Sequence, residues 1–324
     1  MINMPELMNA FSAIAAAAES TNAVLISDYN EAERLKKYVK SNLKVTDSIE
    51  DATIGTAMQS KRSVGIGHIH TVKQLALMRI PSVLISLNRN PVNYAINIYP
   101  ESIQELYDDI ICSFKLSEDK KVLLPIVIHV DSLLKETRAQ LEVMTQKITE
   151  NFMDFFAIDK PEKIVKFTLP DNIESMAIIQ KAFENSKKVI EDVSEQFRKR
   201  TKRSFITMEK MIDGAELLLV SYGPISINSK LAVKKLNELG EKVGAIRIHI
   251  LRPFPDIPEL KSAKKIASID TKFFLGSSGM LHQEIRFLNK DTISFIADIP
   301  SIEDITQIFQ HLKSSDKVER MWMI

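Results

Sequence analysis

Residues 247–255 read RIHILRPFP and close a strand–helix–strand pattern in the last third of the chain. Residues 217–223, LLLVSYG, form the short apolar run that is typical of a buried strand. Residues 229–244 then place apolar side chains at helical spacing, and AIRIHI (245–250) forms the next strand. Two strands joined by a helix in this way predict a parallel pair within one sheet.

The same alternation runs through the first part of the chain, residues 4–130. Apolar strand patterns such as AVLIS (23–27), SVLISLN (82–88) and KVLLPIVIHV (121–130) alternate with helical patterns, the first of them over residues 4–20. Strands that alternate with helices over short connections predict an α/β protein. We therefore expect two open, mostly parallel sheets flanked by helices.

The pattern changes between residues 132 and 206. Helical spacing predicts helices over residues 135–156 and 173–200, with an irregular stretch between them. A chain of 324 residues is long enough for two hydrophobic cores. We therefore predict a first domain over residues 1–206, with a helical extension from about residue 132, and a second domain with the tail over residues 207–324.

Composition narrows the class of protein. A formal net charge of +1 gives no reason to expect nucleic acid or an acidic membrane as partner. No apolar run approaches the roughly 20 residues of a membrane span, and the first residues, MINMPEL, lack the layout of a signal peptide. A cytoplasmic location is expected.

Several segments together carry a resemblance to a known family. They are the RIHILRPFP segment, SID (268–270), GSSGMLHQEI (276–285), residues 8–27, QLALMRIPSVLISLNR (74–89) and residues 103–133. In this order they resemble the alpha subunit of 2-oxoacid:ferredoxin oxidoreductases, the pyruvate synthase family. The resemblance spans nearly the whole chain.

This resemblance implies a fold and a function. The first domain would be of the pyrimidine-type thiamine-diphosphate-binding class, and the second would be similar to the transketolase C-terminal domain. The chain would be one subunit of an enzyme that oxidatively decarboxylates a 2-oxoacid, with pyruvate the expected substrate, to an acyl-coenzyme A. Electrons would pass to ferredoxin through partner subunits.

The resemblance also implies a division of cofactors. Thiamine diphosphate would be shared with a beta subunit, and magnesium and iron–sulfur clusters would be held in partner subunits alone. The single cysteine, Cys112, agrees with this division, because a four-iron cluster needs about four thiolates. Cys112 lies on an apolar helix face and is expected to be a buried, inert thiol.

Three segments depart from the family pattern. The family's Tyr-Pro-Ile-Thr-Pro turn is replaced by residues 27–31, SDYNE, and the loop after Arg89 is shortened to NPVNYAINIYPES (90–102). The family's glycine- and alanine-rich stretch behind a glutamate is replaced by residues 49–63. These changes leave an alternative open, in which the chain is a non-catalytic, degenerate scaffold subunit of such a complex.

Glu50 is the candidate catalytic and cofactor-binding residue. In the family, a glutamate of the alpha subunit meets a ring nitrogen of the thiamine aminopyrimidine, and burial raises the pKa of such a carboxyl. Glu50 is the nearest match, although a gap-free register places Ile49 there. Acidic residues at 47, 50 and 51 are also typical of a helix N-terminus, so a structural role is the competing interpretation.

Arg89, oriented by Asn88, is the candidate substrate-binding residue. It follows a predicted buried strand at its carboxyl end, where open parallel sheets bind ligands. A guanidinium can hold a carboxylate through two parallel hydrogen bonds, as binding of a 2-oxoacid requires. A structural ion pair or a carbonyl cap is the alternative role.

Two other motifs are assigned structural roles. His68 and His70 lie on one side of a strand end, but no third metal ligand is near in the sequence, so no metal site is predicted. GSSG (276–279) precedes a helix and has the backbone N–H groups for an anion, yet a structural helix start is the favoured interpretation.

Overall fold

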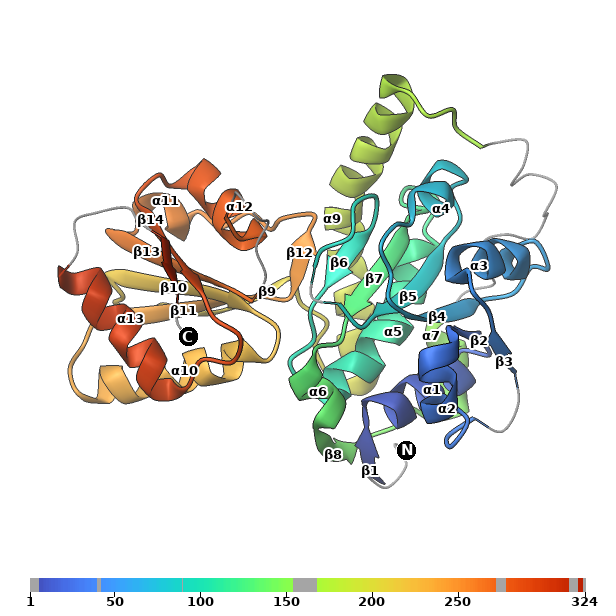
Figure 1. The fold of residues 1–324 in the computed structure, drawn as a ribbon, viewed down its shortest axis with the longest axis horizontal. Helices are drawn as coiled ribbons and strands as arrows, with labels where there is room; N and C mark the ends of the chain where they lie inside the picture. The colour runs from blue at the N-terminus through green and yellow to red at the C-terminus, as the bar shows by residue number, and fades with distance from the viewer. Residues whose placement is uncertain are drawn as a thin grey trace. The chain divides into compact units, whose positions relative to one another are not determined.

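The computed structural model describes residues 6–39, 42–88, 90–153, 168–271, 278–314 and 320–322. The chain divides into two compact units, Met1–Ile206 and Thr207–Ile324 (Figure 1). Each unit has its own sheet and its own hydrophobic core. The candidate site residues Glu50, Asn88 and Arg89 all belong to the first unit, and Arg89 itself lies outside the described residues.

The first unit alternates strands and helices as far as residue 129 and is mainly helical after it. Its elements are β1 (Glu6–Asn9), α1 (Ala10–Ser20), β2 (Val24–Ser27), α2 (Tyr29–Leu35), β3 (Leu43–Val45), α3 (Ile49–Ala57), β4 (Ser63–Gly67), α4 (Lys73–Leu77), β5 (Ser82–Ser86), β6 (Ile96–Ile98), α5 (Ile103–Ser117), β7 (Pro125–His129), α6 (Ser132–Glu136), β8 (Arg138–Leu141), α7 (Gln146–Phe152) and α9 (Ile173–Thr201).

The main sheet of this unit is parallel, with the strand order β6-β7-β5-β4-β2-β3. Val24, Ile26 and Leu84 point from the strands into a core that also contains Ile49 of α3 and Leu75 of α4. The helix α5 packs on β5 and β7 and is itself covered by α1 and α9. The strands are buried along their length, which explains their near-continuous apolar sequence.

Two of the predicted helices are wrong in part. Residues 6–9, predicted as helix, form β1, and residues 138–141, inside the predicted helix 135–156, form β8, which pairs with β1 antiparallel. Side chains of α5 hold the chain after β8 extended. The Gln104 amide bonds both the N–H (2.8 Å) and the C=O (3.3 Å) of Glu142, and the Tyr107 hydroxyl accepts the N–H of Met144 (3.0 Å). These long-range hydrogen bonds override the local helical spacing.

The second unit has a mixed sheet with the order β15-β14-β13-β10-β11-β9, in which all pairs are parallel except β11–β9. Its elements are β9 (Met208–Met211), β10 (Leu217–Tyr222), α10 (Ile225–Glu238), β11 (Val243–Ile248), β12 (Ile250–Arg252), α11 (Glu259–Ser262), β13 (Lys265–Asp270), α12 (Met280–Leu288), β14 (Thr292–Ile296), α13 (Ile302–Ser314) and β15 (Arg320–Trp322).

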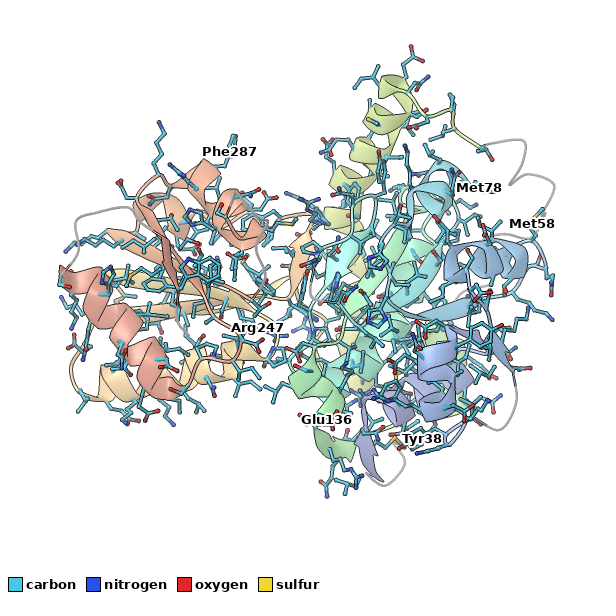
Figure 2. The ribbon with its side chains drawn as sticks, in the orientation of Figure 1. Tyr38, Met58, Met78, Glu136, Arg247 and Phe287 are labelled. Carbon is cyan, nitrogen blue, oxygen red and sulfur yellow. The ribbon has the colours of Figure 1, made fainter. Side chains whose placement is uncertain are left out.

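Helices lie on both sides of this second sheet. In Figure 1, α10 and α13 lie on one side and α11 and α12 on the other, and the core between α10, α13 and the strands contains Leu219, Val233 and Phe309. Phe287 of α12 points outward and is 91% exposed (Figure 2). The predicted fold class, two open and mostly parallel sheets flanked by helices, is confirmed.

Across the described residues, no helix is both long and apolar enough to cross a membrane. The longest helix, α9, carries a charged or polar residue at most positions of its exposed side.

A buried ion pair joins the segment that directly follows α9 to α5. The guanidinium of Arg203 binds the Asp108 carboxylate through two bonds, Nε–Oδ2 at 2.7 Å and Nη2–Oδ1 at 2.8 Å. Asp108 is 4% exposed, and burial raises the pKa of its carboxyl to about 7, against the opposing effect of Arg203. The pair ties the helical extension to the sheet-covering helix.

Replacing Arg203 should therefore destabilise the first unit. Arg203→Leu leaves the buried Asp108 carboxyl without its guanidinium, and a loss of about 3 kcal/mol in the free energy of unfolding is expected. Arg198→Leu, at an exposed position in the last turn of α9, is the matched control and should change that free energy by less than about 0.5 kcal/mol. Urea denaturation followed by circular dichroism measures both, and equal effects would refute a stabilising role for the pair.

Candidate active site

The carboxyl ends of the parallel strands of the first unit meet at one edge of the sheet. The chain forms β2, then β3 on one side of it, and then β4 on the other side. Loops that leave β2 and β4 therefore run in opposite directions, and such a switch point is where open α/β sheets bind ligands. The residues that follow these strand ends are the first place to look for chemistry.

Asp28 directly follows β2 and lies across the end of β4. Its Oδ1 accepts the N–H of Glu31 (3.0 Å) and so caps α2, while its Oδ2 lies 3.9 Å from Nδ1 of His68. A Cβ on Gly67 would come within 2.4 Å of that Oδ2, so glycine is needed there for the carboxylate to fit. Asp28 and His68 therefore bring a carboxyl group and an imidazole together at the switch point.

Glu50 lies in the first turn of α3, beside the same strand ends. The Ser48 hydroxyl starts this helix by accepting the N–H of Asp51 (3.2 Å). Oε1 of Glu50 accepts the N–H groups of Gln74 (3.0 Å) and Leu75 (3.4 Å) at the start of α4. Partial burial raises the pKa of the Glu50 carboxyl, and the two backbone hydrogen bonds oppose this rise. Oε2 accepts no hydrogen bond from the described residues.

Ile49, the neighbour of Glu50, fills a different place. It is buried and packs on the strand: a Cβ on Gly65 would lie 2.6 Å from its Cγ2, and a Cβ on Gly67 would lie 2.7 Å from its Cδ1. Ile49 therefore belongs to the core, and Glu50 is the carboxyl that this turn of the helix presents outside it.

Asn88 follows β5, and its backbone is held by a buried histidine. His129, the last residue of β7, is 3% exposed, and its Nδ1 donates to the Asn88 carbonyl (2.7 Å). Its Nε2 lies 2.8 Å from Oδ1 of Asn97 in β6, and its ring stacks on Tyr99 with centroids 4.4 Å apart. Burial lowers the pKa of His129 to about 4, and the hydrogen bond to Asn88 opposes this change.

His129 and Asn97 were not identified from the sequence. The available signal is a polar residue inside an otherwise apolar strand pattern, as in PIVIH and INI. Such residues need a buried partner, but the sequence does not say which one, because the two lie 32 positions apart.

The surroundings of Cys112 and of the possible metal ligands can also be described. Cys112 is fully buried, and burial raises the pKa of its thiol well above the usual value, so it is inert. In the parts of the chain that are described, no group of three or more acidic, histidine or cysteine side chains is arranged to hold a metal.

The start of α12 is already occupied by a carboxyl of its own unit. Asp270, at the end of β13, is fully buried and accepts the N–H groups of Leu281 (2.9 Å) and His282 (3.1 Å). A Cβ on Gly279 would lie 2.0 Å from its Cγ, so the glycine lets the carboxyl approach. Burial raises the pKa of Asp270 to about 7. Residues 276–277 of the GSSG motif lie outside the described residues.

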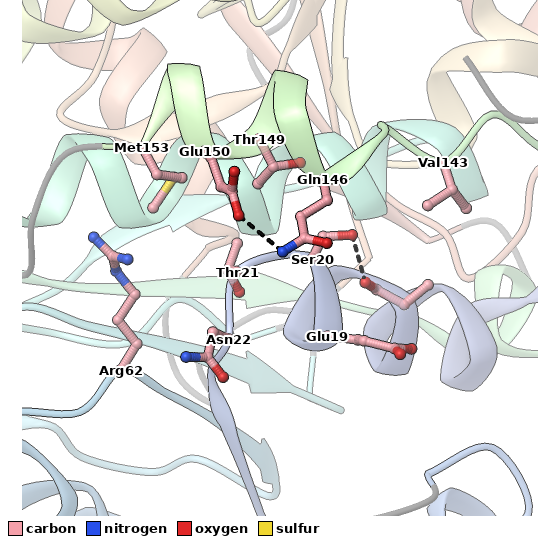
Figure 3. Close-up of a pocket in the computed structure, with 11 residues that line it drawn as sticks. Glu19, Ser20, Thr21, Asn22, Arg62, Val143, Gln146, Thr149, Glu150 and Met153 are labelled. Atoms are coloured by element: carbon pink, nitrogen blue, oxygen red, sulfur yellow. Dashed lines mark hydrogen bonds between the residues drawn. The ribbon is translucent and has the colours of Figure 1, made fainter. Parts of the chain in front are cut away.

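A cavity of about 1100 Å³ opens at the opposite end of the first unit (Figure 3). Its lining includes Asn22, which precedes β2, and Arg62, which precedes β4, so it lies at the amino ends of the strands. The Arg62 guanidinium is bound to Glu118 through two bonds of 2.6 and 2.7 Å. Because ligands of parallel sheets bind at carboxyl ends, this cavity is not the candidate active site.

Comparison with known proteins gives three consistent findings. A family model described as pyruvate:ferredoxin oxidoreductase core domain II matches residues 215–307. The pyruvate synthase subunit PorA of Methanocaldococcus jannaschii is 30% identical over 85% of this chain and 83% of that protein. The ketoisovalerate oxidoreductase subunit VorA of Pyrococcus abyssi is 29% identical over 58% of this chain and 51% of that protein.

A solved structure is similar over almost the whole chain. It is a 2-oxoglutarate:ferredoxin oxidoreductase from Magnetococcus marinus with 2-oxoglutarate, coenzyme A and succinyl-CoA bound. The TM-score is 0.70 at 13% identity, covering 95% of this chain and 65% of that one. At this identity the similarity establishes the fold.

The low pKa of His129 predicts how stability depends on pH. Because the pKa is about 4 in the folded state and near 6.5 in the unfolded state, the folded state favours the neutral ring. This contribution is present in full above pH 6.5 and is lost as the pH falls towards 4. The destabilisation caused by His129→Asn should therefore be larger at pH 7 than at pH 4.5, by about 2 kcal/mol.

Urea denaturation of both proteins at the two pH values measures this difference. All other titrating groups are shared by the two proteins, so their contributions cancel in the comparison. A pH-independent difference would contradict the lowered pKa.

Proposed function

The chain belongs to the alpha-subunit family of 2-oxoacid:ferredoxin oxidoreductases, and from this we propose that it forms the thiamine-ring side and part of the substrate side of such an enzyme's active site. Family membership confirms the resemblance inferred from the sequence. The relatives are named as subunits of a pyruvate synthase and of a ketoisovalerate oxidoreductase, which favours the catalytic interpretation over the degenerate scaffold.

The observation that carries the proposal is the Glu50 carboxyl at the carboxyl edge of the first sheet. Thiamine diphosphate, when bound, supplies a carbon nucleophile for the 2-oxo group and an electron sink for decarboxylation. Glu50 fits the proton-exchanging contact that the aminopyrimidine ring needs. Its pKa is raised by burial, so it holds a proton more readily than an exposed glutamate, and its Oε2 is not used by described neighbours.

Asn88 and Arg89 form the proposed substrate side. Asn88 lies at the end of β5 with its carbonyl fixed by His129, and Arg89 is the next residue in the chain. A guanidinium at this edge suits the carboxylate that every 2-oxoacid carries. Pyruvate is the substrate we propose, because the relative matched over most of its length is a pyruvate synthase subunit.

The remaining parts of the reaction are assigned to partners. We infer that a beta subunit holds the diphosphate through magnesium and that iron–sulfur clusters in partner subunits pass electrons to ferredoxin. The inert Cys112 agrees with clusters held elsewhere. Coenzyme A would accept the acyl group, and the complex would work in the cytoplasm. The first unit would be the pyrimidine-type domain and the second the transketolase C-terminal-like domain.

Glu50→Gln tests the catalytic assignment. The amide oxygen can still accept the N–H groups of Gln74 and Leu75, so α4 keeps its cap, but proton exchange with the thiamine ring is lost. We expect pyruvate-dependent reduction of a viologen dye by the complex to fall by about 100-fold or more. Asp51→Asn, at the exposed neighbouring position, is the control and should retain activity. Full activity of the Glu50 variant would remove the assignment.

Arg89→Ala tests the substrate assignment. Loss of a paired carboxylate contact should raise the KM for pyruvate by about 10-fold or more, with a smaller change in kcat. Asn90→Ala, at the exposed next position, is the matched control. An unchanged KM in the Arg89 variant would exclude it from substrate binding.

A further inference from the structure

The segment between β5 and β6 is folded back on itself by one buried side chain. Asn97, which is fully buried, accepts the N–H of Val92 through Oδ1 (2.7 Å) and donates through Nδ2 to the carbonyls of Val92 (2.9 Å) and Ala95 (2.7 Å). The donors and acceptors of the backbone fix which end of the amide is oxygen. Asn97 thus closes residues 92–97 into one rigid loop.

This loop adopts a backbone conformation that needs such support. Tyr94 has a φ of 68°, in the left-handed region that non-glycine residues seldom adopt. The bonds from Asn97 on either side of Tyr94 hold the chain there. The loop therefore presents a fixed surface to whatever packs on it.

His129 connects this rigid loop to the turn after β5. Oδ1 of Asn97 lies 2.8 Å from Nε2, Tyr99 covers one ring face, and Nδ1 is 2.7 Å from the Asn88 carbonyl. The Asn88 carbonyl and Oδ1 of Asn97 are both acceptors, and a neutral imidazole carries one N–H, so the ring can donate to only one of them. Donation from Nδ1 to the Asn88 carbonyl, the shorter of the two contacts, is the arrangement that orders the turn. The Ser86 hydroxyl also approaches the Asn88 carbonyl, at the longer distance of 3.4 Å.

Burial at position 129 carries an unfavourable desolvation free energy for a polar side chain. The other residues of β7 are apolar and buried, and an apolar side chain at 129 would avoid the desolvation of the imidazole. Hydrogen bonds between buried polar groups rigidify the segments that they join. The geometry fixed here is that of the turn that begins at Asn88.

We propose that His129 is a positioning residue for substrate binding, which holds the Asn88 turn against the rigid 92–97 loop so that the turn can receive the carboxylate of a 2-oxoacid. This inference rests on the proposed function for the identity of the substrate. The mechanical part, in which His129 orders the turn through its Nδ1–H, concerns this chain alone.

Two isosteric variants separate the two ring nitrogens. His129→Asn keeps an N–H where Nδ1 is, and therefore the bond to Asn88. His129→Gln moves its N–H to the place of Nε2, and therefore loses that bond. In the complete, anaerobically purified complex, His129→Gln should raise the KM for pyruvate by about 10-fold, with a smaller loss of kcat, and His129→Asn should keep KM within about 3-fold.

Arg203→Leu is the control for instability alone. It removes a buried ion pair far along the chain from the Asn88 turn, so it should lower the thermal midpoint without raising KM. If KM follows the thermal midpoint across all three variants, His129 is merely structural and the proposal is overturned.

Hydrogen exchange read by mass spectrometry provides a second test that needs no turnover. Amides of residues 90–92 should exchange faster in His129→Gln than in the unchanged protein, and at the unchanged rate in His129→Asn. Equal exchange in both variants overturns the proposal. If the unchanged complex oxidises no 2-oxoacid, the proposed function fails, and the exchange result still decides whether His129 orders the turn.

Discussion

In a parallel sheet each strand must be entered from the same end, so the carboxyl ends of β2, β4, β5 and β7 gather at one edge. The rest of the first unit depends on this constraint. Because the strands are buried along their length, polar residues next to them lie at the strand ends. At the switch point between β2 and β4, the loops that leave the carboxyl ends of these two strands run in opposite directions. Asp28, Glu50 and Asn88 lie there because the topology leaves that edge open.

Polar groups at such an edge can bind a ligand only if they are held in place and still keep an atom that is free of hydrogen bonds within the chain. Glu50 gives one oxygen to the start of α4 and keeps the other available, and partial burial raises its pKa. Asn88 has its carbonyl fixed by His129. In the second unit the comparable position is closed, because Asp270 fills the start of α12. The two units therefore differ in how far the carboxyl at this place is buried: Asp270 is fully buried against α12, whereas Glu50 is only partly buried.

The apolar runs and helical spacing were enough to predict the alternating elements and the mostly parallel sheets, and the resemblance of several sequence segments was enough to identify the family. They failed at β1 and β8, where hydrogen bonds from Gln104 and Tyr107 override local spacing. They also could not predict the contact between His129 and Asn97. A polar residue in an apolar strand indicates that it has a buried partner, but it does not indicate which residue that partner is. Glu50 and Asn88 were reached through the resemblance. The competing structural role of Glu50, an acidic residue at a helix N-terminus, is also present in the structure, where Glu50 lies in the first turn of α3 and accepts two N–H groups at the start of α4. Arg89 stays a prediction.

The central claim is that this chain completes a thiamine-dependent 2-oxoacid oxidoreductase with partner subunits. Anaerobic purification of the tagged chain from its own host, with thiamine diphosphate quantified in the product, tests it most directly. The account predicts a brown complex that contains thiamine diphosphate and reduces viologen dye when pyruvate and coenzyme A are added. A stable complex without thiamine diphosphate or turnover would contradict it and show that the chain is a scaffold.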